Sequence, residues 1–445
     1  MAERLVVIGG DAAGMSAATN ARRGRPDLDI VVVEKGRHTS YSACGIPYVV
    51  SGEVDGLDEL IVRTPQEFRD GFRIDVRTRH EAVAIDLDAR RLEVRALDQQ
   101  RTLHLGFDLL HIATGARPRR PSLPGIDGPD IYGVQTLDDA QQLLDVVAAQ
   151  RCRNVTVVGA GYIGLEMAEA FVRRGARVTM IDSRPQPMGT LDPEMGERVA
   201  AAARSFGIDV RCGVEVEGFE PGVVHTSGGA LASDLVILGT GVAPNAHLAL
   251  EAGLTAGARD AIRVDHRQRT SSEGIYAAGD CADTVHLVSR NRVHVALGTI
   301  ANKTGRVAGV NLGGGYASFP GVLGTAVTRV CEIEIARTGL TEAEANAAGI
   351  EVTVGRVEAT SRAGYYPGAE PVHVKVLIER DTERIIGGQL VGADRAGKGI
   401  DMLATAITAG MTASQLLDLD LAYAPAVAPI WDGFQLAVMQ ARRAK

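Results

Sequence analysis

The sequence predicts an α/β fold built from two strand–turn–helix–strand units. Two observations predict it: an apolar run meets a glycine-rich turn near the N-terminus, and the same pattern returns after residue 150. A third is the glycine content, because 52 of 445 residues is about 12%, against the roughly 7% usual in proteins. Glycine in excess indicates many tight turns between strands and helices. Each unit is typical of a Rossmann-like dinucleotide-binding domain.

The first unit begins with the apolar run 5–8, which leads into the turn 9–14 and then into a helix of small residues. A second apolar strand, 29–34, ends on Glu34. Backbone N–H groups at the start of a helix bind a pyrophosphate, and a carboxylate at the end of the second strand binds a ribose. The middle glycine of the G-x-G-x-x-G pattern is replaced by Asp11, so this first copy is imperfect.

The second unit has the complete pattern. Strand 155–158 leads into the turn 159–164, and strand 177–182 ends on Asp182. Two such units in one chain point to two dinucleotides, and the natural pair is a flavin that holds electrons and a nicotinamide that delivers hydride. Asp182 is expected to bind the ribose diol and to repel a 2′-phosphate, which favours NADH, although Arg184 offsets part of that repulsion.

Three later strands also end on glycine turns, at 112–115, 238–241 and 274–280. The first two suit places where the chain crosses between domains. At the third, the carboxylate of Asp280 is expected to accept a hydrogen bond from a ribityl hydroxyl, while Gly279 lets the backbone approach.

The composition argues against several classes of protein. The net charge of −8 and the 4% aromatic content argue against a nucleic-acid or anionic-membrane surface. The apolar runs are too short for a signal peptide or a membrane helix. The five cysteines are widely spaced, without a C-x-x-C pair, and the histidines lack ligand spacing, so no metal site is expected. The cysteine pattern suits a reducing compartment, and a cytoplasmic location is expected.

In their order along the chain, these motifs resemble those of the two-dinucleotide-binding-domain flavoproteins, the pyridine nucleotide–disulfide oxidoreductases. The resemblance covers nearly the whole chain. It implies a discontinuous FAD-binding domain of residues 1–116 and 245–320, an NAD(P)H-binding domain of residues 117–244, and a C-terminal α+β dimerisation domain of residues 321–445. It also implies a homodimer that uses FAD and NADH, with NADPH as the alternative nucleotide.

The residues that the resemblance assigns to cofactor binding lie at the glycine turns, at the ends of the following strands and at one position between them. They are Gly9, Gly10, Ala13, Gly14, Glu34, Lys35, Val83, Thr114, Gly115, Gly279 and Asp280 for the flavin side, and Gly159, Gly161, Tyr162, Ile163, Gly164, Asp182 and Gly241 for the nicotinamide side.

The sequence around Cys44 distinguishes between the branches of the family. The glutathione-reductase branch has a second cysteine five residues later, where this chain has Val49, and it ends in a His-Glu pair that is missing here. A C-terminal cysteine pair is also missing, which excludes an internal disulfide relay. The remaining single-cysteine branch includes coenzyme A-disulfide reductases, persulfide reductases, NADH oxidases and NADH peroxidases. The Cys-Gly-Ile-Pro-Tyr sequence with Pro47 resembles the first two.

In those relatives, the tyrosines that match Tyr365 and Tyr423 reach into the thiol site of the partner subunit, where they are expected to donate a proton or hydrogen bond to the departing sulfur. The positions expected to contact the substrate are Ser16, Asn20, Arg23, Ser40 and Asn302.

A lone redox cysteine alternates between a thiolate and a mixed disulfide with a substrate thiol, so its pKa must be lowered. A helix that begins near Cys44, with Pro47 in its first turn, is expected to favour the anion. The leading hypothesis is an FAD-dependent NAD(P)H oxidoreductase that reduces coenzyme A disulfide or a related small disulfide or persulfide. An NADH oxidase with oxygen as the acceptor, and a flavin-based redox sensor or electron-transfer protein, are the alternatives.

Overall fold

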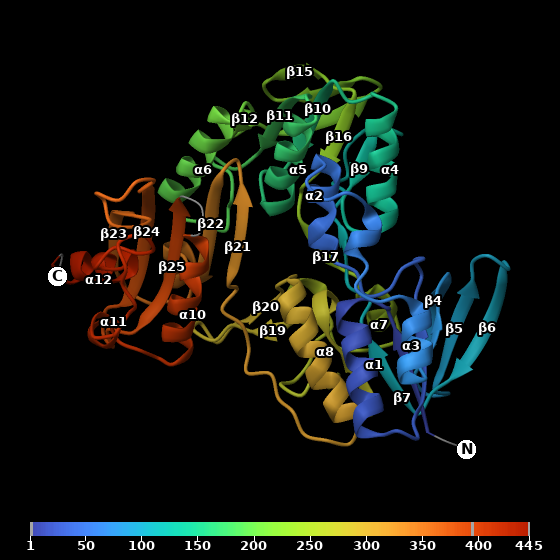
Figure 1. Cartoon of the computed structure of the whole chain (residues 1–445). Coiled ribbons are helices and arrows are strands. Elements are labelled where there is room, and N and C mark those ends of the chain that lie inside the picture. The colour runs from blue at the N-terminus through green and yellow to red at the C-terminus, as the bar shows by residue number, and fades with distance from the viewer. Residues whose placement is uncertain (1–2, 393–395, 444–445) are drawn as a thin grey trace.

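The computed structural model describes residues 3–392 and 396–443, and three five-stranded sheets organise them (Figure 1). The first sheet has the order β18-β7-β1-β2-β3, and all of its strands are parallel. Its strands are β1 (Arg4–Ile8), β2 (Asp29–Val33), β3 (Asp75–Arg77), β7 (Leu109–Ile112) and β18 (Ile275–Ala277). The apolar runs form central strands because both faces of the sheet are covered.

Two helices pack side by side against this first sheet, α1 (Ala12–Gly24) and α8 (Gly298–Leu312). An antiparallel meander packs against the opposite face of the sheet, formed by β4 (His80–Asp86), β5 (Arg91–Ala96) and β6 (Arg101–Gly106). Shorter helices follow β2 and the crossing segments: α2 (Ile46–Ser51), α3 (Pro65–Phe72) and α7 (His247–Glu251).

The second sheet repeats the parallel arrangement in the order β12-β11-β10-β16-β9. Its strands are β9 (Ile131–Gly133), β10 (Asn154–Val158), β11 (Arg177–Asp182), β12 (Asp209–Cys212) and β16 (Leu235–Leu238). The helices are α4 (Leu137–Ala148), α5 (Tyr162–Arg173) and α6 (Pro193–Ser205), and a small antiparallel sheet joins β13 (Val216–Glu220), β14 (Val223–Thr226) and β15 (Gly229–Ala232).

The chain passes between the two parallel sheets at β8 (Ala116–Pro118) and β17 (Val242–Pro244), which pair with each other in antiparallel register. Thr114 precedes β8, and its hydroxyl donates to the carbonyl oxygen of Asn245 at 2.5 Å. Gly115 and Gly241 both have positive φ angles, of 67° and 86°, where the chain turns into these strands.

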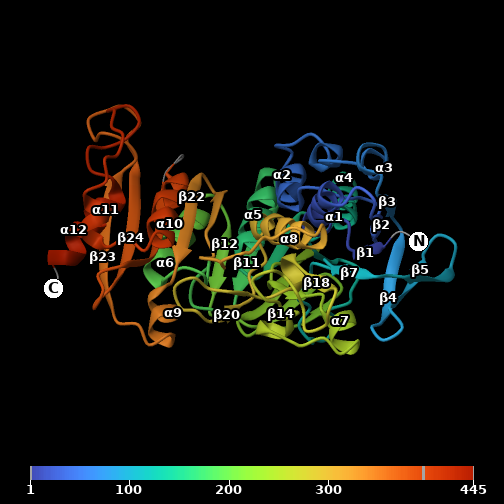
Figure 2. The same ribbon diagram turned by 90° about the horizontal axis from the view of Figure 1, so that it is seen from below.

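The third sheet is antiparallel, with the order β21-β22-β25-β24-β23, and lies at the opposite end of the molecule from β4–β6 (Figure 2). Its strands are β21 (Ala326–Val330), β22 (Ile333–Gly339), β23 (Val352–Thr360), β24 (Pro371–Glu379) and β25 (Ile385–Gly392), with two short strands before it, β19 (Thr284–Val285) and β20 (Arg292–Val293). Helices α9 (Glu342–Ala347), α10 (Ile400–Thr408), α11 (Ala413–Leu417) and α12 (Gly433–Arg443) complete it.

The predicted fold class is confirmed: two Rossmann-like parallel sheets precede a C-terminal α+β unit. Within the described ranges, none of the helices is both long enough and apolar enough to cross a membrane.

Helices α1 and α8 approach closely because glycines lie at their contact. A Cβ atom on Gly305 would lie 2.4 Å from the carbonyl oxygen of Ala13, and one on Gly309 would lie 2.4 Å from that of Ala17. Such distances are far below van der Waals contact, so the backbones touch directly. This packing holds α8 against the start of α1, where the first glycine turn lies.

We predict that Gly305→Ala lowers the stability of the protein by about 1–3 kcal/mol, because overpacking forces the two helices apart. Gly298→Ala is the matched control, since a Cβ on Gly298, in the same helix, would meet nothing within 4 Å. The thermal melting temperature of the two variants checks this expectation. Equal melting temperatures would show that the α1–α8 contact accommodates the added methyl group without loss of stability.

Candidate active site

The first glycine turn holds the strand-end carboxylate of Glu34. Its two oxygens accept hydrogen bonds from the N–H groups of Gly10 and Gly36, each at 2.6 Å. Gly9 has a φ of 103°, and a Cβ on Gly14 would lie 1.9 Å from the carbonyl oxygen of Gly9. The turn is therefore closed by backbone contact, and Glu34 lies directly beside it.

Asp11 occupies the position of the missing glycine without strain, because its φ of −102° is extended. Its carboxylate accepts the backbone N–H of Tyr41 at 3.1 Å, and burial raises its pKa to about 6. Asp11 thereby connects the glycine turn to the loop that carries Cys44.

The turn at Gly279 packs against the first glycine turn, since a Cβ on Gly279 would lie 2.8 Å from the Cβ of Ala13. Asp280 follows it, and burial raises the pKa of this carboxyl group to about 6. Its Oδ1 atom is buried and has no hydrogen-bond partner among the described residues. A buried acceptor without a donor is costly, so this carboxylate suits a ligand hydroxyl.

The second glycine turn repeats the geometry of the first. A Cβ on Gly164 would lie 1.9 Å from the carbonyl oxygen of Gly159, and the carboxylate of Asp182 accepts the N–H of Ala160 at 2.7 Å. A Cβ on Gly161 would meet nothing within 4 Å, so this position is open to a ligand phosphate.

Asp182 also has a cation beside it. The Arg184 side chain donates to both carboxylate oxygens, with Nε 2.9 Å from Oδ1 and a terminal nitrogen 2.7 Å from Oδ2. Although burial opposes it, this pairing and the backbone N–H groups hold the pKa of Asp182 below its usual value. Asp182, the expected ribose-binding residue, and Arg184, the expected counter-charge, therefore lie together.

Cys44 lies in a single 3₁₀ turn, Ala43–Gly45, between the two parallel units. Helix α2 follows it and packs against α5 of the second unit (Figure 1), where Arg174 donates to the carbonyl oxygen of Val50 at 2.7 Å. The thiol reaches solvent and is not part of a disulfide.

The expectation that the helix start lowers the pKa of Cys44 is wrong for the chain by itself. Partial burial raises this pKa, and the carboxylates of Glu166, Asp280 and Asp11 raise it further. Helix α2 begins at Ile46, two residues after the thiol, with Pro47 in its first turn as expected.

Glu166 is a site residue that the sequence reasoning missed. It lies on α5, burial raises its pKa, and the hydroxyl of Thr328 in β21 donates to it at 2.5 Å. The available signal was an acid between the apolar residues Leu165 and Met167, directly after the second glycine turn.

The structure brings three of the predicted substrate residues together on the contact between α1 and α8. The Ser16 hydroxyl donates to the carbonyl oxygen of Asn302 at 3.1 Å, and the Asn20 amide donates to that of Ser16 at 2.8 Å. Arg23 lies further along α1, with its guanidinium 6.0 Å from the ring centre of Phe72.

A second arginine, absent from the prediction, lies beside the same ring. The guanidinium of Arg63 is 5.1 Å from the ring centre of Phe72, and its backbone N–H donates to the carbonyl oxygen of Ser40 at 3.3 Å. Arg23 and Arg63 thus lie against one aromatic ring, and Ser40 is bonded to the backbone of Arg63.

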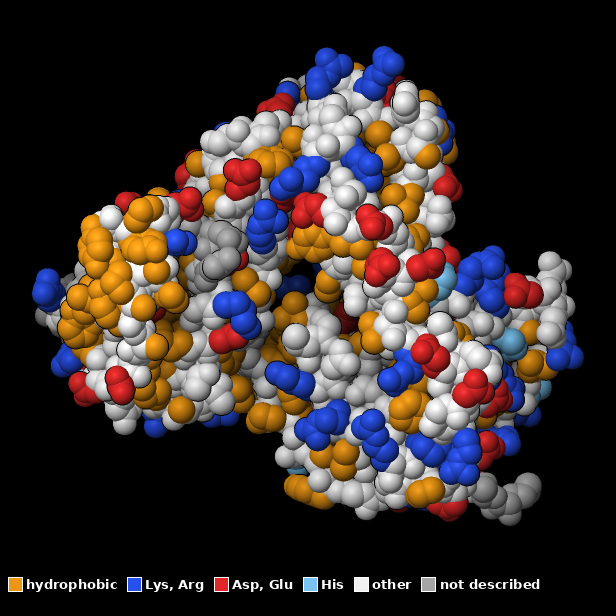
Figure 3. All heavy atoms as spheres, in the orientation of Figure 1, with side chains coloured by type: hydrophobic (Ala, Val, Ile, Leu, Met, Phe, Trp, Pro, Cys, Tyr) orange, Lys and Arg blue, Asp and Glu red, His pale blue; other side chains and the backbone are white. Residues whose placement is uncertain are grey.

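Tyr365 and Tyr423 lie on loops of the C-terminal unit. Their exposed fractions are 78% and 45%, and a hydrogen bond with Tyr365 raises the pKa of Tyr423. Hydrophobic side chains gather over this end of the molecule (Figure 3), and the exposed ones include Val427, Ile430 and Trp431.

The remaining predicted residues lie near the turns. Lys35 is exposed and pairs with Glu81 at 2.8 Å. Val83 falls at a register shift between β4 and β5, which leaves it without a partner in the paired register. Tyr162 and Ile163 begin α5, where the Tyr162 hydroxyl lies buried beside Thr190.

Comparisons with known proteins agree with this geometry. Residues 3–305 match the pyridine nucleotide-disulphide oxidoreductase family, and residues 325–432 match the dimerisation domain of that family. The match to the dimerisation domain indicates that two copies of the chain associate.

The chain is 38% identical to an NAD(P)H sulfur oxidoreductase (CoA-dependent) of Pyrococcus furiosus over 97% of each protein. It is 35% identical to an NADH oxidase of Methanocaldococcus jannaschii over 98% of each. A solved NAD-dependent persulfide reductase from A. fulgidus superposes with a TM-score of 0.94 at 38% identity, over 99% of this chain and 82% of that one.

The resemblance inferred from the glycine turns and Cys44 is confirmed. The chain belongs to the pyridine nucleotide-disulphide oxidoreductase family and is an FAD-dependent oxidoreductase that uses a pyridine nucleotide.

Proposed function

We propose that the protein uses NADH to reduce coenzyme A disulfide, or a related small disulfide or persulfide, through Cys44 as its single redox-active cysteine. The position of this thiol carries the proposal. It lies near enough to Asp11, Asp280 and Glu166 for their charges to act on it, and these residues come from both glycine-turn units and from the Gly-Asp turn. Of the other cysteines, Cys281 lies in the Gly-Asp turn but is fully buried, and Cys331 is buried as well.

We further propose the domain division 1–116 with 245–320, 117–244, and 321–445. The membership of β7 and β18 in the first sheet, and the pairing of β8 with β17 at the crossing, support it. The five unpaired cysteines support a reducing, cytoplasmic location.

The residues around the first turn fit FAD. Asp280 offers a buried acceptor without a donor for a ribityl hydroxyl, and Glu34 lies beside the turn where the adenosine ribose would bind. The unpaired backbone of Val83 would contact the adenine. When bound, FAD accepts hydride from the pyridine nucleotide and supplies two electrons to a sulfur.

The residues around the second turn fit the pyridine nucleotide. Its pyrophosphate would lie over Gly161, where the surface is open, and Asp182 would bind the adenosine ribose. We propose NADH as the preferred form, since Asp182 occupies the place where a 2′-phosphate would lie.

In the proposed cycle, the Cys44 thiolate attacks one sulfur of a substrate disulfide. One S–S bond forms between Cys44 and the substrate, the original S–S bond breaks, and one substrate thiolate leaves. Two electrons that originate from NADH then cleave the mixed disulfide, which returns the Cys44 thiolate and releases the second thiol after it takes up a proton.

Tyr365 and Tyr423 would donate a hydrogen bond or proton to the departing sulfur across the dimer. Their mutual hydrogen bond, their exposure and the apolar side chains around them support a place at an interface. Each pair would then serve the Cys44 of the partner subunit rather than that of its own chain.

The cations around Phe72 support coenzyme A as the carrier of the disulfide. Arg23 and Arg63 provide two guanidinium groups for its phosphates, and Ser16, Asn20 and Asn302 lie on the neighbouring helix contact. Arginine binds phosphate through charge-assisted hydrogen bonds.

NADH oxidase activity is the second candidate. The solvent-accessible thiol of Cys44 supports it, because such a thiol can cycle through a sulfenic acid while oxygen accepts the electrons. One of the relatives, from Methanocaldococcus jannaschii, is also named an NADH oxidase.

We predict that Cys44→Ser retains FAD and its bleaching by NADH but loses coenzyme A-disulfide turnover by roughly a hundredfold or more, because serine does not exchange with disulfides. NADH consumption is measured without oxygen, with and without the disulfide. Cys152→Ser is the control and should keep full activity. Turnover that requires oxygen and ignores the disulfide would instead assign an NADH oxidase.

We predict that Asp280→Asn stabilises the FAD-free protein but weakens its affinity for FAD. Burial raises the pKa of Asp280 from 3.8 to about 6, so the folded form binds this proton more tightly, and the carboxylate costs stability as the pH rises between about 4 and 6. The difference amounts to about 3 kcal/mol at neutral pH.

Urea unfolding of the FAD-free proteins at pH 4.5 and pH 7.5, together with FAD titration, measures both effects. Asp55→Asn is the control at an exposed position and should change neither quantity. Unchanged FAD affinity in the Asp280 variant would remove this carboxylate from the cofactor site.

We predict that Arg63→Gln or Arg23→Gln raises the KM for coenzyme A disulfide about tenfold, because each removes a charge-assisted bond to phosphate. The KM for bis(2-hydroxyethyl) disulfide, which carries no phosphate, should stay constant. Arg37→Gln alters an exposed arginine of the same unit and serves as the control. Parallel changes for both disulfides would contradict a phosphate-binding role.

A further inference from the structure

The loop of residues 183–192, between β11 and α6, rests on the second glycine turn. The N–H of Met188 in this loop donates to the carbonyl oxygen of Ala160 at 2.7 Å. Gly189 follows, and a Cβ at this position would lie 2.1 Å from a terminal guanidinium nitrogen of Arg184. The path of the loop therefore determines where the Arg184 side chain lies.

The middle of this loop adopts a backbone conformation that needs support. Met188 is fully buried and has a φ of 53°, in the left-handed region that side chains other than glycine disfavour. Such a conformation persists only where the surrounding structure holds it. Besides the bond from Met188 to Ala160, supporting contacts lie at the far end of the loop.

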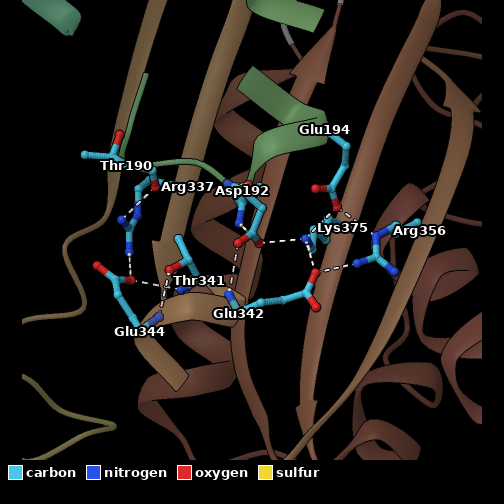
Figure 4. A network of polar contacts seen from close by, with 10 residues as sticks. Thr190, Asp192, Glu194, Arg337, Thr341, Glu342, Glu344, Arg356 and Lys375 are labelled. Atoms are coloured by element: carbon cyan, nitrogen blue, oxygen red, sulfur yellow. Dashed lines mark hydrogen bonds and ion pairs between the residues drawn. The ribbon is translucent and has the colours of Figure 1, made fainter. Parts of the chain in front are cut away.

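Two residues of the C-terminal sheet hold that far end (Figure 4). Arg337 of β22 donates to the carbonyl oxygen of Thr190 at 2.8 Å. The side chain of Gln389 in β25 forms two hydrogen bonds with Asp192: it accepts the backbone N–H at 2.8 Å and donates to the carboxylate at 2.6 Å. The end of the loop is thus bonded to two strands of another unit.

Lys375 of β24 provides the third attachment and has no exposed surface. Its Nζ lies 2.7 Å from Asp192, 2.6 Å from Glu194 and 2.5 Å from Glu342, and Arg356 binds the last two carboxylates (Figure 4). A buried ammonium group requires paired charges. Separation of the start of α6 from the sheet would therefore leave the Lys375 ammonium group buried without its paired carboxylates, which is unfavourable.

We propose that Lys375, Gln389 and Arg337 are positioning residues for the pyridine-nucleotide site. By fixing the loop, they hold Arg184 against Asp182, where the adenosine ribose would bind. The inference rests on the proposed function, because it takes Asp182 as the ribose-binding residue. The C-terminal sheet then takes part in coenzyme recognition in addition to subunit association.

The first test is Gln389→Met, a change of similar size that removes both hydrogen bonds to Asp192. We expect the KM for NADH and the dissociation constant of NAD⁺, measured by calorimetry without turnover, to rise roughly fivefold. The kcat at saturating NADH should stay within about twofold, because neither Cys44 nor the flavin side is touched. The ratio of kcat/KM for NADPH to that for NADH should rise, since a freed Arg184 can bind a 2′-phosphate.

Two further variants test the attachment of the loop and the position of Arg184. Lys375→Met should produce a larger change of the same kind, with folding verified by flavin content and melting temperature; if it fails to fold, Gln389→Met decides. Gly189→Ala displaces Arg184 directly and should shift the NADPH to NADH ratio in the same direction. Lys398→Met is the control, because this lysine pairs with Asp401 at the surface of the same unit and should change nothing.

Unchanged NAD⁺ affinity and unchanged KM in a folded Gln389→Met protein would overturn the inference. A fall in kcat at constant KM would overturn it as well, because that result is what a purely structural role produces. Failure of the proposed function looks different, since the wild-type protein itself would then oxidise NADH without dependence on a disulfide, or would prefer NADPH.

Discussion

The carboxylates gathered around Cys44 are the constraint on which this site depends. Burial raises the pKa of Asp11 and of Asp280 to about 6, and it raises the pKa of Glu34 and Glu166 as well. These acids come from separate segments that the fold brings into one region, without an arginine or lysine bonded to Asp11 or Asp280 in the described residues. Such a region is unfavourable when empty and favours a ligand rich in hydroxyl and amide donors, which is the chemistry of a dinucleotide.

The two glycine turns share a hydrogen bond to the acid at the end of the following strand, and they differ at the third position of the turn. In each, a strand-end acid accepts the N–H of the turn's second residue, Glu34 from Gly10 and Asp182 from Ala160. The third position is Asp11 in one turn and Gly161 in the other, with similar extended backbones. Replacement of glycine by aspartate therefore costs no strain there. The added carboxylate accepts the N–H of Tyr41 and so connects the turn to the loop that carries Cys44.

The sequence predicted the features that depend on neighbouring residues, and it failed for those that depend on contacts between residues distant in the chain. The turns and the strand-end acids are local patterns, and the fold class followed from them. The pKa of Cys44 was assigned the wrong direction because burial of the thiol, which raises it most, and the charges of Glu166 and Asp280 come from segments distant in sequence. Arg63 escaped notice because an arginine in a loop is unremarkable until the fold places it over Phe72. Only the packed structure contains that information.

The C-terminal sheet is bonded to the second unit at two separate places, which bears on the geometry at the thiol. One is the buried network around Lys375 and Asp192. The other is the β21–β22 hairpin, where the N–H of Cys331 donates to Glu169 at 2.9 Å and Thr328 donates to Glu166 at 2.5 Å.

Because α5 is bonded to the β21–β22 hairpin through Glu166 and Glu169, the position of Glu166 depends on the C-terminal sheet. Burial raises the pKa of Cys44 most, and Glu166 is one of three carboxylates that raise it further. One of the charges that act on the thiol is therefore positioned by a hairpin of the C-terminal sheet. The sheet thus shapes the surroundings of Cys44 within one chain.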